Sequence, residues 1–265
     1  MRSIGINQTK IVCGILGHPL QKPRSVKIWK AYFKKNNIFS SMNKFDVLPE
    51  DLKNFITKLR NNQNFLAMAI TMPYKKKILN FAKNLDDFAK KTGSANLIIN
   101  KKNNLFAYNT DIFGAIESIK TQLIKYNNII IIGLGGTGSA LFNFLRKKYS
   151  AKKFILISSK SKSSFRLKKL ILFKKINVEI LKKKSLIINC TPLGSNLSKK
   201  YLNKTPISQQ LFSSINKKSF IFDVVYSPKI NLLSRLSKKF SIDYKNGVHM
   251  NTIQAERALK LIFKK

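Results

Sequence analysis

Short apolar runs alternate with amphipathic segments along most of the chain. Residues 11–16 and 65–70 are apolar runs of the length and composition typical of buried strands. Between them, apolar residues recur at helical spacing in two segments, one beginning at Ser25 as its N-cap and one beginning at Pro49. This alternation is typical of βαβ units and predicts an α/β fold built on parallel strands.

A second series of strand-like runs fills the C-terminal half of the chain. It comprises residues 129–132, 154–157, 186–188 and 220–225, with helical stretches between them and a final helix from Met250 onward. The chain is long enough for two domains of ordinary size. We therefore predict two α/β domains: residues 1–115, joined by the C-terminal helix at about 246–265, and residues 116–245.

The first strand of the second series runs into a glycine-rich turn. Gly133, Gly135 and Gly138 have the spacing Gly-x-Gly-x-x-Gly, and a helix is expected to begin at Ser139. In this context the glycines permit a tight turn, close approach of a pyrophosphate and close helix packing, and the helix N-terminus adds free N–H groups. The motif predicts a Rossmann-like dinucleotide-binding domain. Glycines that serve only the turn and the packing are the alternative.

The residues after the next strand indicate which dinucleotide binds. NAD-binding units commonly place an acid there, but here the strand ends in Ser158, Ser159 and Lys160, and no Asp or Glu occurs between Ser118 and Val178. An acid would repel a 2′-phosphate, whereas hydroxyl and ammonium groups bind one. We therefore expect NADP rather than NAD, unless Lys160 is simply one more lysine in a lysine-rich chain.

The chain is strongly basic, with 51 Lys and Arg residues against 11 Asp and Glu residues and a net charge of +40. Such a charge is typical of proteins that bind nucleic acid or another polyanion. The basic residues are spread along the whole sequence, together with many Asn, Ile and Phe residues, which A/T-rich codons encode. Drift in the coding sequence and selection for polyanion binding are therefore both explanations, and no specific nucleic-acid partner is expected.

The two cysteines, Cys13 and Cys190, lie far apart in apolar runs, so we expect neither a disulfide nor a Cys-x-x-Cys metal site. His18 and His249 are also too far apart to indicate metal binding, and we expect structural or loop roles for them. No apolar run approaches the roughly 18 residues that a membrane helix needs. These features favour a cytoplasmic protein without a membrane anchor, and they are compatible with a monomer or a homodimer.

A lysine and an aspartate are candidates for acid–base chemistry. Lys75 follows the strand at residues 65–70 after a short turn, and Asp111 follows an apolar segment near the end of the first domain. An ammonium group that pairs with a carboxylate can protonate a ketone oxygen as a nicotinamide delivers hydride to the carbon. Taken alone, Lys75 is better explained as a surface lysine, because Lys76 and Lys77 follow it.

Several segments occur in the order and spacing of motifs known from one enzyme family. Residues 69–75 read Ala-Ile-Thr-Met-Pro-Tyr-Lys and resemble the Asn-Val-Thr-Val-Pro-Phe-Lys segment that carries the catalytic lysine in the shikimate dehydrogenase family. Residues 189–194 read Asn-Cys-Thr-Pro-Leu-Gly and resemble that family's Asn-Ala-Thr-Pro-x-Gly. Further segments that resemble its motifs are residues 93–96, 109–111, 223–228 and 247–254.

The resemblance implies an NADP-dependent oxidoreductase that reversibly reduces 3-dehydroshikimate, a small-molecule substrate, to shikimate in the chorismate pathway of aromatic amino-acid biosynthesis. It implies the acid–base role for Lys75, paired with Asp111. The substrate-binding residues that it implies are Ser25, Thr71, Asn96, Asp111, Tyr226 and Gln254. The cofactor-binding residues that it implies are Gly133, Leu134, Gly135, Gly136, Thr137, Ser158, Ser159, Lys160, Val224 and Gly247.

The chain departs from the family pattern at several positions. Pro23 replaces one of two serines in the substrate-carboxylate loop, Ala69 replaces an asparagine, and Ile112 replaces the glycine after Asp111. Residues 158–160 replace an Asn-Arg-Thr phosphate clamp, so a bidentate guanidinium is missing. A related quinate or aminoshikimate dehydrogenase is therefore an alternative function. A catalytically inactive, basic nucleic-acid-binding protein is a third.

Overall fold

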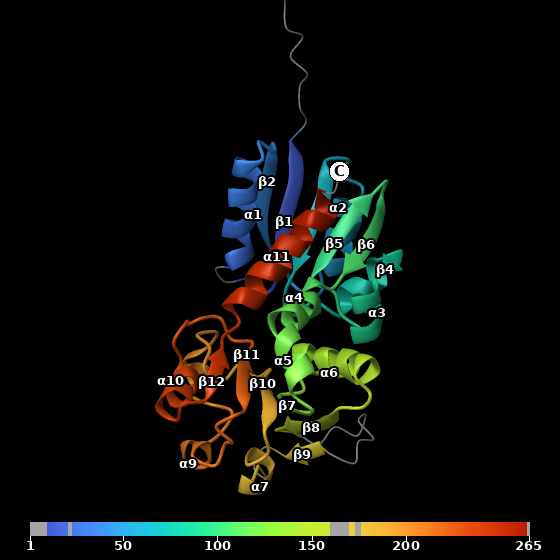
Figure 1. The fold of residues 1–265 in the computed structure, drawn as a ribbon. Coiled ribbons are helices and arrows are strands. Elements are labelled where there is room, and N and C mark those ends of the chain that lie inside the picture. The colour runs from blue at the N-terminus through green and yellow to red at the C-terminus, as the bar shows by residue number, and fades with distance from the viewer. Residues whose placement is uncertain (1–9, 21–22, 160–169, 173–175, 264–265) are drawn as a thin grey trace, which may run out of the picture. The chain divides into compact units, whose positions relative to one another are not determined.

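The structure is a computed structural model that describes residues 10–20, 23–159, 170–172 and 176–263. The chain divides into two compact units: unit 1 consists of Met1–Thr110 with Ala255–Lys265, and unit 2 consists of Asp111–Gln254. Both are α/β units (Figure 1), which confirms the predicted fold class. The divisions, at 110/111 and 254/255, lie five residues before and nine residues after the expected boundaries at 115/116 and 245/246.

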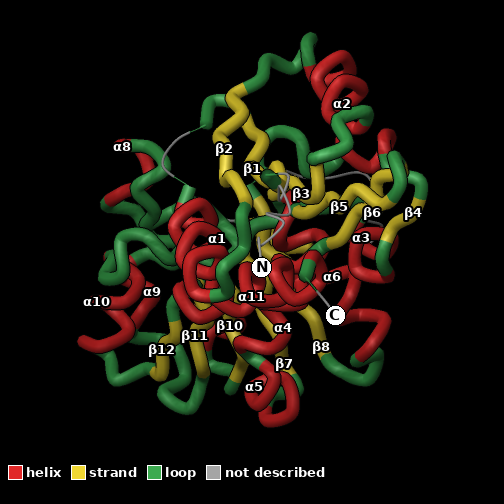
Figure 2. The backbone as a smooth tube through the Cα atoms, turned by 90° about the horizontal axis from the view of Figure 1, so that it is seen from above, coloured by secondary structure: helices red, strands yellow, loops and turns green. Residues whose placement is uncertain are grey.

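Unit 1 contains a six-stranded sheet in the order β2-β1-β3-β5-β6-β4, which runs from left to right in Figure 2. The strands are β1 (Ile11–Gly17), β2 (Ser40–Asp46), β3 (Phe65–Ile70), β4 (Asn84–Leu85), β5 (Leu97–Lys101) and β6 (Asn104–Tyr108). β1 pairs in parallel with β3, as predicted, and also with β2, a strand that was not predicted, but β5 is antiparallel to both of its neighbours. The purely parallel pattern was therefore wrong here, because Lys102 and Asn103 form a tight turn with positive φ between β5 and β6.

The helices of unit 1 begin at positions that differ slightly from those predicted. They are α1 (Arg24–Lys35), α2 (Leu52–Arg60), the 3₁₀ helix η1 (Lys77–Phe81), α3 (Asp87–Thr92) and the end of α11 (Val248–Ile262). Ser25 does not cap α1: Pro23 is the N-cap, since its ring holds φ at −71° in extended backbone and it has no N–H to satisfy. Likewise α2 begins after a turn at residues 49–51, in which the Asp51 N–H donates to the Leu48 carbonyl at 3.1 Å.

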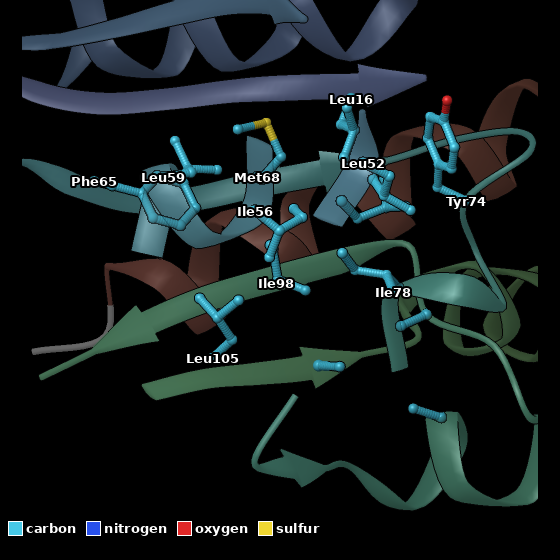
Figure 3. Packing of buried hydrophobic residues seen from close by; sticks show 14 residues of the cluster. Leu16, Leu52, Ile56, Leu59, Phe65, Met68, Tyr74, Ile78, Ile98 and Leu105 are labelled. Carbon is cyan, nitrogen blue, oxygen red and sulfur yellow. The ribbon is translucent and has the colours of Figure 1, made fainter. Parts of the chain in front are cut away.

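Two apolar clusters cover the sheet of unit 1. One joins α2 to β3, β5 and the segment after β3, and Figure 3 shows side chains of these elements facing one another. It buries Tyr74 and Ile78, and these two side chains therefore anchor residues 75–77, which lie between them, to the core. The other cluster joins α1 to the last turns of α11. It contains Trp29 from α1 and Ala258 and Leu259 from α11.

Unit 2 contains a parallel sheet in the order β12-β11-β10-β7-β8-β9. The strands are β7 (Asn128–Ile132), β8 (Lys153–Ser158), β9 (Leu170–Leu172), β10 (Ser185–Asn189), β11 (Phe220–Asp223) and β12 (Asp243–Lys245). Numbered within the unit, this order is 3-2-1-4-5-6 read from β9, the arrangement of dinucleotide-binding folds, and it confirms the Rossmann-like prediction. The order reverses between β7 and β10, so a crevice is expected at their carboxyl ends.

The helices of unit 2 are α4 (Thr110–Ser118), α5 (Lys120–Lys125), α6 (Gly136–Lys148), α7 (Val178–Leu181), α8 (Lys199–Leu202), α9 (Gln209–Phe212), α10 (Leu232–Lys239) and the start of α11. The expected start of α6 at Ser139 was wrong: Gly135 is the extended N-cap, and the glycines after it are already helical. β11 ends at Asp223 rather than Val225, because the Asp223 carboxylate accepts the Val225 N–H at 3.0 Å and turns the chain. Among the described residues, no helix is long and apolar enough to cross a membrane.

The C-terminal helix is held to α1 by aromatic rings. Phe263 stacks on Tyr32 and meets Phe33 edge-on, both with centroids 5.8 Å apart. We expect Phe263→Ala to lower the free energy of unfolding by about 2 kcal/mol, less than the roughly 3–5 kcal/mol of a fully buried Phe because Phe263 is partly exposed. Urea unfolding followed by circular dichroism measures it. Phe39→Ala is the control, since Phe39 is 54% exposed, and an equal loss in both variants would contradict the role of the ring cluster.

Candidate active site

Lys75 lies at the carboxyl edge of the first sheet, one turn after β3. Its carbonyl accepts the Ala95 N–H at 2.7 Å, and the Thr71 N–H donates to the Leu16 carbonyl at 2.9 Å, so the segment is tied to both neighbouring strands. Lys75 is half-buried, whereas Lys76 and Lys77 are exposed. The structure thus distinguishes Lys75 from the lysines beside it, which the sequence alone did not.

Asn96, predicted to bind substrate, is buried and engages Thr110. Its Oδ1 accepts the Thr110 N–H at 2.7 Å, and its Nδ2 donates to Thr110 Oγ1 at 2.9 Å. The Asn96 N–H also donates to the Tyr108 carbonyl at 3.0 Å, which brings the start of β5 to the end of β6. Asn96 therefore fixes the residue directly before Asp111 and lies next to Ala95, the partner of Lys75.

Asp86 and Asn109 support this edge, although neither was predicted to have a role. Asp86 Oδ1 accepts the N–H groups of Ala89 at 2.7 Å and Asn109 at 3.2 Å, so it caps α3 and holds the end of β6. Burial raises the pKa of Asp86, opposed by these two N–H donors. The Asn109 side chain donates to the Ser94 carbonyl at 2.9 Å, and the loop before Asn96 is thereby fixed as well.

The loop after β1 is tied to the end of β2 by a second carboxylate. Asp46 Oδ1 lies 2.7 Å from His18 Nδ1, and Asp46 Oδ2 accepts the Leu20 N–H at 2.9 Å. The Leu20 N–H and His18 together lower the pKa of Asp46. This loop leads to Ser25, which is half-buried in the first turn of α1 at the same edge of the sheet. A role for Asp46 could not be predicted from the sequence, because its partners are distant along the chain.

Asp111 and Gln254, also predicted to bind substrate, lie on two helices that pack closely within unit 2. A Cβ at Gly114 would lie 2.7 Å from the Met250 carbonyl oxygen and 3.0 Å from Gln254 Cβ, so only glycine permits this approach of α4 to α11. Asp111 is one turn before Gly114 on the same helix face. Ile112, which departs from the family pattern, is buried with 1% of its surface exposed.

The glycine-rich turn joins β7 to α6 at the point where the strand order reverses. Gly133 has φ +93°, and a Cβ there would lie 2.7 Å from Thr191 Cγ2 in the segment after β10. A Cβ at Gly138 would lie only 1.8 Å from the Gly133 carbonyl oxygen, so this glycine is required for the helix to pack on the turn. Gly135 and Gly136, in contrast, are exposed and face open space.

These features fit a dinucleotide pyrophosphate. α6 begins at Gly135 with no side-chain cap, so its first N–H groups are available to an anion in the open space at the two glycines. Leu134 is buried and Thr137 half-buried in the same turn. Ser158 is buried and Ser159 exposed at the end of β8, where the adenosine ribose is expected. Lys160, the predicted partner of a 2′-phosphate, lies outside the described residues.

A buried carboxylate organises the remaining loops of this edge. Asp223 Oδ1 accepts Asn189 Nδ2 at 2.9 Å and the Val225 N–H at 3.0 Å, while Oδ2 accepts Asn231 Nδ2 at 2.8 Å and the Tyr244 hydroxyl at 3.0 Å. Burial raises the pKa of Asp223, and the donors oppose that shift. The sequence motif contained Asp223 but gave no hint of Asn231 or Tyr244.

The predicted cofactor residues Val224 and Gly247 lie against each other beyond β11. The Val224 N–H donates to the Asn189 carbonyl at 3.0 Å, and the Gly247 N–H donates to the Val225 carbonyl at 3.0 Å. A Cβ at Gly247 would lie 2.2 Å from the Val224 carbonyl oxygen, so glycine is required there too. Tyr226, predicted to bind substrate, follows them and is 37% exposed.

The cysteines and histidines do not form a metal site within the described residues, in which no group of three His, Cys, Asp or Glu side chains could hold an ion. Cys13 and Cys190 are free thiols. Burial raises the pKa of Cys190 to about 12, with a smaller contribution from the Asp223 charge, although Cys190 lies beside the glycine turn. A thiol with this pKa is a poor nucleophile at neutral pH.

Comparisons with known proteins agree with this geometry. A family model described as the shikimate dehydrogenase substrate binding domain matches residues 15–98. Shikimate dehydrogenase (NADP+) from Clostridium botulinum strain Hall is 30% identical over 252 residues, which cover 94% of this chain and 95% of that protein. The structure of shikimate dehydrogenase 1 from Peptoclostridium difficile is 25% identical with a TM-score of 0.76, covering 95% of this chain and 91% of that one.

A third similarity concerns the fold alone. Quinate dehydrogenase from Corynebacterium glutamicum, solved in complex with NAD, is 18% identical and has a TM-score of 0.81, covering 97% of this chain and 95% of that one. The same two-unit fold therefore serves a protein named for a different substrate and solved with a different cofactor. Fold similarity does not distinguish these activities.

Two glycines of the turn should respond differently to an added methyl group. Gly136→Ala places a Cβ in the open space, so we expect the fold to persist but the affinity for a dinucleotide to fall about tenfold or more. Gly138→Ala forces the Gly133 carbonyl aside, so we expect this variant to lose dinucleotide affinity and also to have a free energy of unfolding lower by about 1–3 kcal/mol. Thermal unfolding and NADPH titration by fluorescence separate the two effects. Equal unfolding temperatures in the two variants would contradict this assignment.

The Asp223 network should be sensitive to loss of one acceptor. Asp223→Asn keeps the shape but turns an acceptor into a donor that faces the amide of Asn189 or Asn231. We expect it to lower the free energy of unfolding by about 1–3 kcal/mol, the cost of a buried unpaired polar group. Tyr244→Phe removes only one donor to the carboxylate and should lower the free energy of unfolding by less. Chemical denaturation of both variants measures this order, and a larger loss in Tyr244→Phe would argue against a central role for the carboxylate.

Proposed function

Because this chain belongs to the shikimate dehydrogenase family, we propose that it catalyses the NADPH-dependent, reversible reduction of 3-dehydroshikimate to shikimate. The proposal rests above all on the half-buried Lys75, whose carbonyl is bonded to Ala95 next to Asn96 at the carboxyl edge of the first sheet. The relative from Clostridium botulinum, named shikimate dehydrogenase (NADP+), supports it along 94% of the chain. The free thiols of Cys13 and Cys190 are compatible with a reducing cytoplasm, where we expect the enzyme to act.

In this proposal Lys75 is the general acid. When bound, NADPH supplies a hydride to the ketone carbon of the substrate. The Lys75 ammonium group donates a proton to the ketone oxygen, with Asp111 as its proposed carboxylate partner. In the reverse direction the neutral amine of Lys75 accepts the proton from the hydroxyl group. Both directions therefore need the same residue near the same oxygen.

The remaining proposed residues bind and orient. Substrate hydroxyl and carboxylate groups would be bound by Ser25, Thr71, Asn96, Asp111, Tyr226 and Gln254. The dinucleotide would be held by residues 133–137 at the N-terminus of α6, by Ser158, Ser159 and Lys160 on its adenosine side, and by Val224 and Gly247. Exposed Gly135 and Gly136 and the uncapped start of α6 support the pyrophosphate part of this assignment.

A quinate or aminoshikimate dehydrogenase is the second candidate, and the substrate loop is the observation that favours it. Pro23 is the N-cap of α1 and has no N–H, so the loop offers one donor fewer than the family pattern. Ile112 fills a buried position where the family has glycine. We favour shikimate because Lys75, Asn96 and Asp111 all match the family motifs, whereas the similarity to a quinate dehydrogenase extends only to the fold.

The decisive assay follows NADPH oxidation by absorbance with 3-dehydroshikimate as substrate. We expect turnover by the wild type and a loss of about 10²–10⁴-fold in kcat for Lys75→Ala, because a positioned general acid contributes a factor of that size. Lys76→Ala is the matched control, since it removes an exposed neighbouring charge and should leave kcat within about twofold.

The same assay, with other substrates and NADH, separates the alternatives. The proposal requires that 3-dehydroshikimate and NADPH give the highest kcat/KM. A higher value in the reverse direction for quinate than for shikimate would assign the second function. A folded wild type with no turnover on any of them would refute the proposed activity.

A further inference from the structure

The amino edge of the second sheet carries a concentration of lysines that the proposed activity does not use. β11, β10, β7 and β8 lie next to one another (Figure 1), and Phe220, Leu186, Ile129 and Phe154 form one row across them. Lysines stand at or just before the start of each of these strands. We call them the edge lysines: Lys125, Lys148, Lys152, Lys153, Lys184 and Lys218.

Four of these lysines are arranged around two tyrosine rings. The ammonium groups of Lys148 and Lys152 each lie 5.8 Å from the centroid of the Tyr149 ring. Those of Lys184 and Lys125 lie 5.5 and 5.9 Å from the centroid of the Tyr126 ring. Lys152 Nζ also donates to the Tyr126 carbonyl at 2.8 Å, which links the two groups. Cation–π contacts thus gather like charges that would otherwise separate.

A groove of about 690 Å³ opens beside the Tyr149 ring. Its lining combines ammonium groups, an aromatic ring, amides and a hydroxyl: Asn127, Asn128, Lys148, Tyr149, Ser150, Ala151, Lys152 and Lys153. No acid lines it. Two acids lie near this edge among the described residues: Asp243, the first residue of β12, which is paired with Phe220, and Glu179 in α7, which is paired with Lys182 at 3.6 Å. The edge therefore has a strong excess of positive charge.

We propose that this edge binds single-stranded nucleic acid without sequence preference. Phosphates would lie along the edge lysines, and a base would enter the groove against Tyr149 and the amides of Asn127 and Asn128. A row of charges across four strands fits an extended polyanion better than a single small anion. This site is at the opposite edge of the sheet from the glycine turn, so it does not depend on the proposed dehydrogenase activity.

The test compares two variants of the full chain with the same net charge. The edge variant carries Lys148→Gln, Lys153→Gln and Lys184→Gln, and the control variant carries Lys27→Gln, Lys53→Gln and Lys58→Gln on exposed helix positions of unit 1. Fluorescence anisotropy measures binding of a labelled oligouridine at several salt concentrations. We expect the edge variant to bind about 10- to 100-fold more weakly. A plot of the logarithm of its association constant against the logarithm of salt concentration should also be less steep by about 2, as for three lost phosphate contacts.

The control variant should change binding by less than about twofold at moderate salt, because the lysines that it removes do not belong to the edge lysines and exposed charges that make no contact with the ligand are screened. Equal weakening of both variants would mean that the overall charge alone attracts RNA, and it would overturn the proposal. Inorganic polyphosphate or an acidic peptide that binds the wild type as tightly as oligouridine would also overturn it, since bases would then contribute nothing. Circular dichroism and NADPH oxidation, each expected to be unchanged in both variants, show that the fold and the proposed activity are intact.

Discussion

Hydrogen bonds that close the ends of strands fix the backbone beside Lys75 and the side chain of Asn96. At the end of a strand the backbone loses its ladder partners, and a buried N–H or C=O left unpaired is costly. In unit 1 the Lys75 carbonyl is paired by Ala95, and the Thr110 N–H by the Asn96 side chain. These pairs leave little freedom to the residues beside them, and that rigidity is what an acid–base residue requires.

The two units satisfy this requirement with different chemistry. Unit 1 uses mainly neutral amides and hydroxyls at its carboxyl edge, whereas unit 2 buries the Asp223 carboxylate among four donors. Desolvation of a charge costs several kcal/mol, and each hydrogen bond to a charged group returns roughly 1.5–3 kcal/mol. Four such bonds reduce this cost without cancelling it, since burial still raises the pKa of Asp223. One side chain can therefore fix the segments after β10 and β11 together with α10 and β12.

Local patterns in the sequence predicted the glycine turn and the apolar strands β1, β3, β7, β8, β10 and β11, whereas β2, β4, β5, β6, β9 and β12 were not predicted. The run at residues 65–70 became β3 with the same bounds, and the spacing of Gly133, Gly135 and Gly138 gave the turn at the switch point. Features that depend on distant partners could not be predicted. Asp46 contacts His18 and Leu20 from another strand, and Tyr244 donates to Asp223 from the neighbouring strand β12. Helix starts were displaced because single side-chain and glycine geometries, rather than periodicity, decide where a helix begins.

The positions of the lysines in the fold indicate more about their roles than the net charge of the chain does. In a parallel α/β sheet, helices start near the carboxyl edge and end near the amino edge, so their dipoles favour anions at the first and lysines at the second. Lys125 and Lys148 lie in the last turns of α5 and α6, and helix stability alone accounts for them. Lys153, Lys184 and Lys218 lie at or before strand starts, beyond any last helical turn, where the dipole no longer favours them. The repulsion among charges gathered there is unfavourable for folding, and a bound polyanion would remove it.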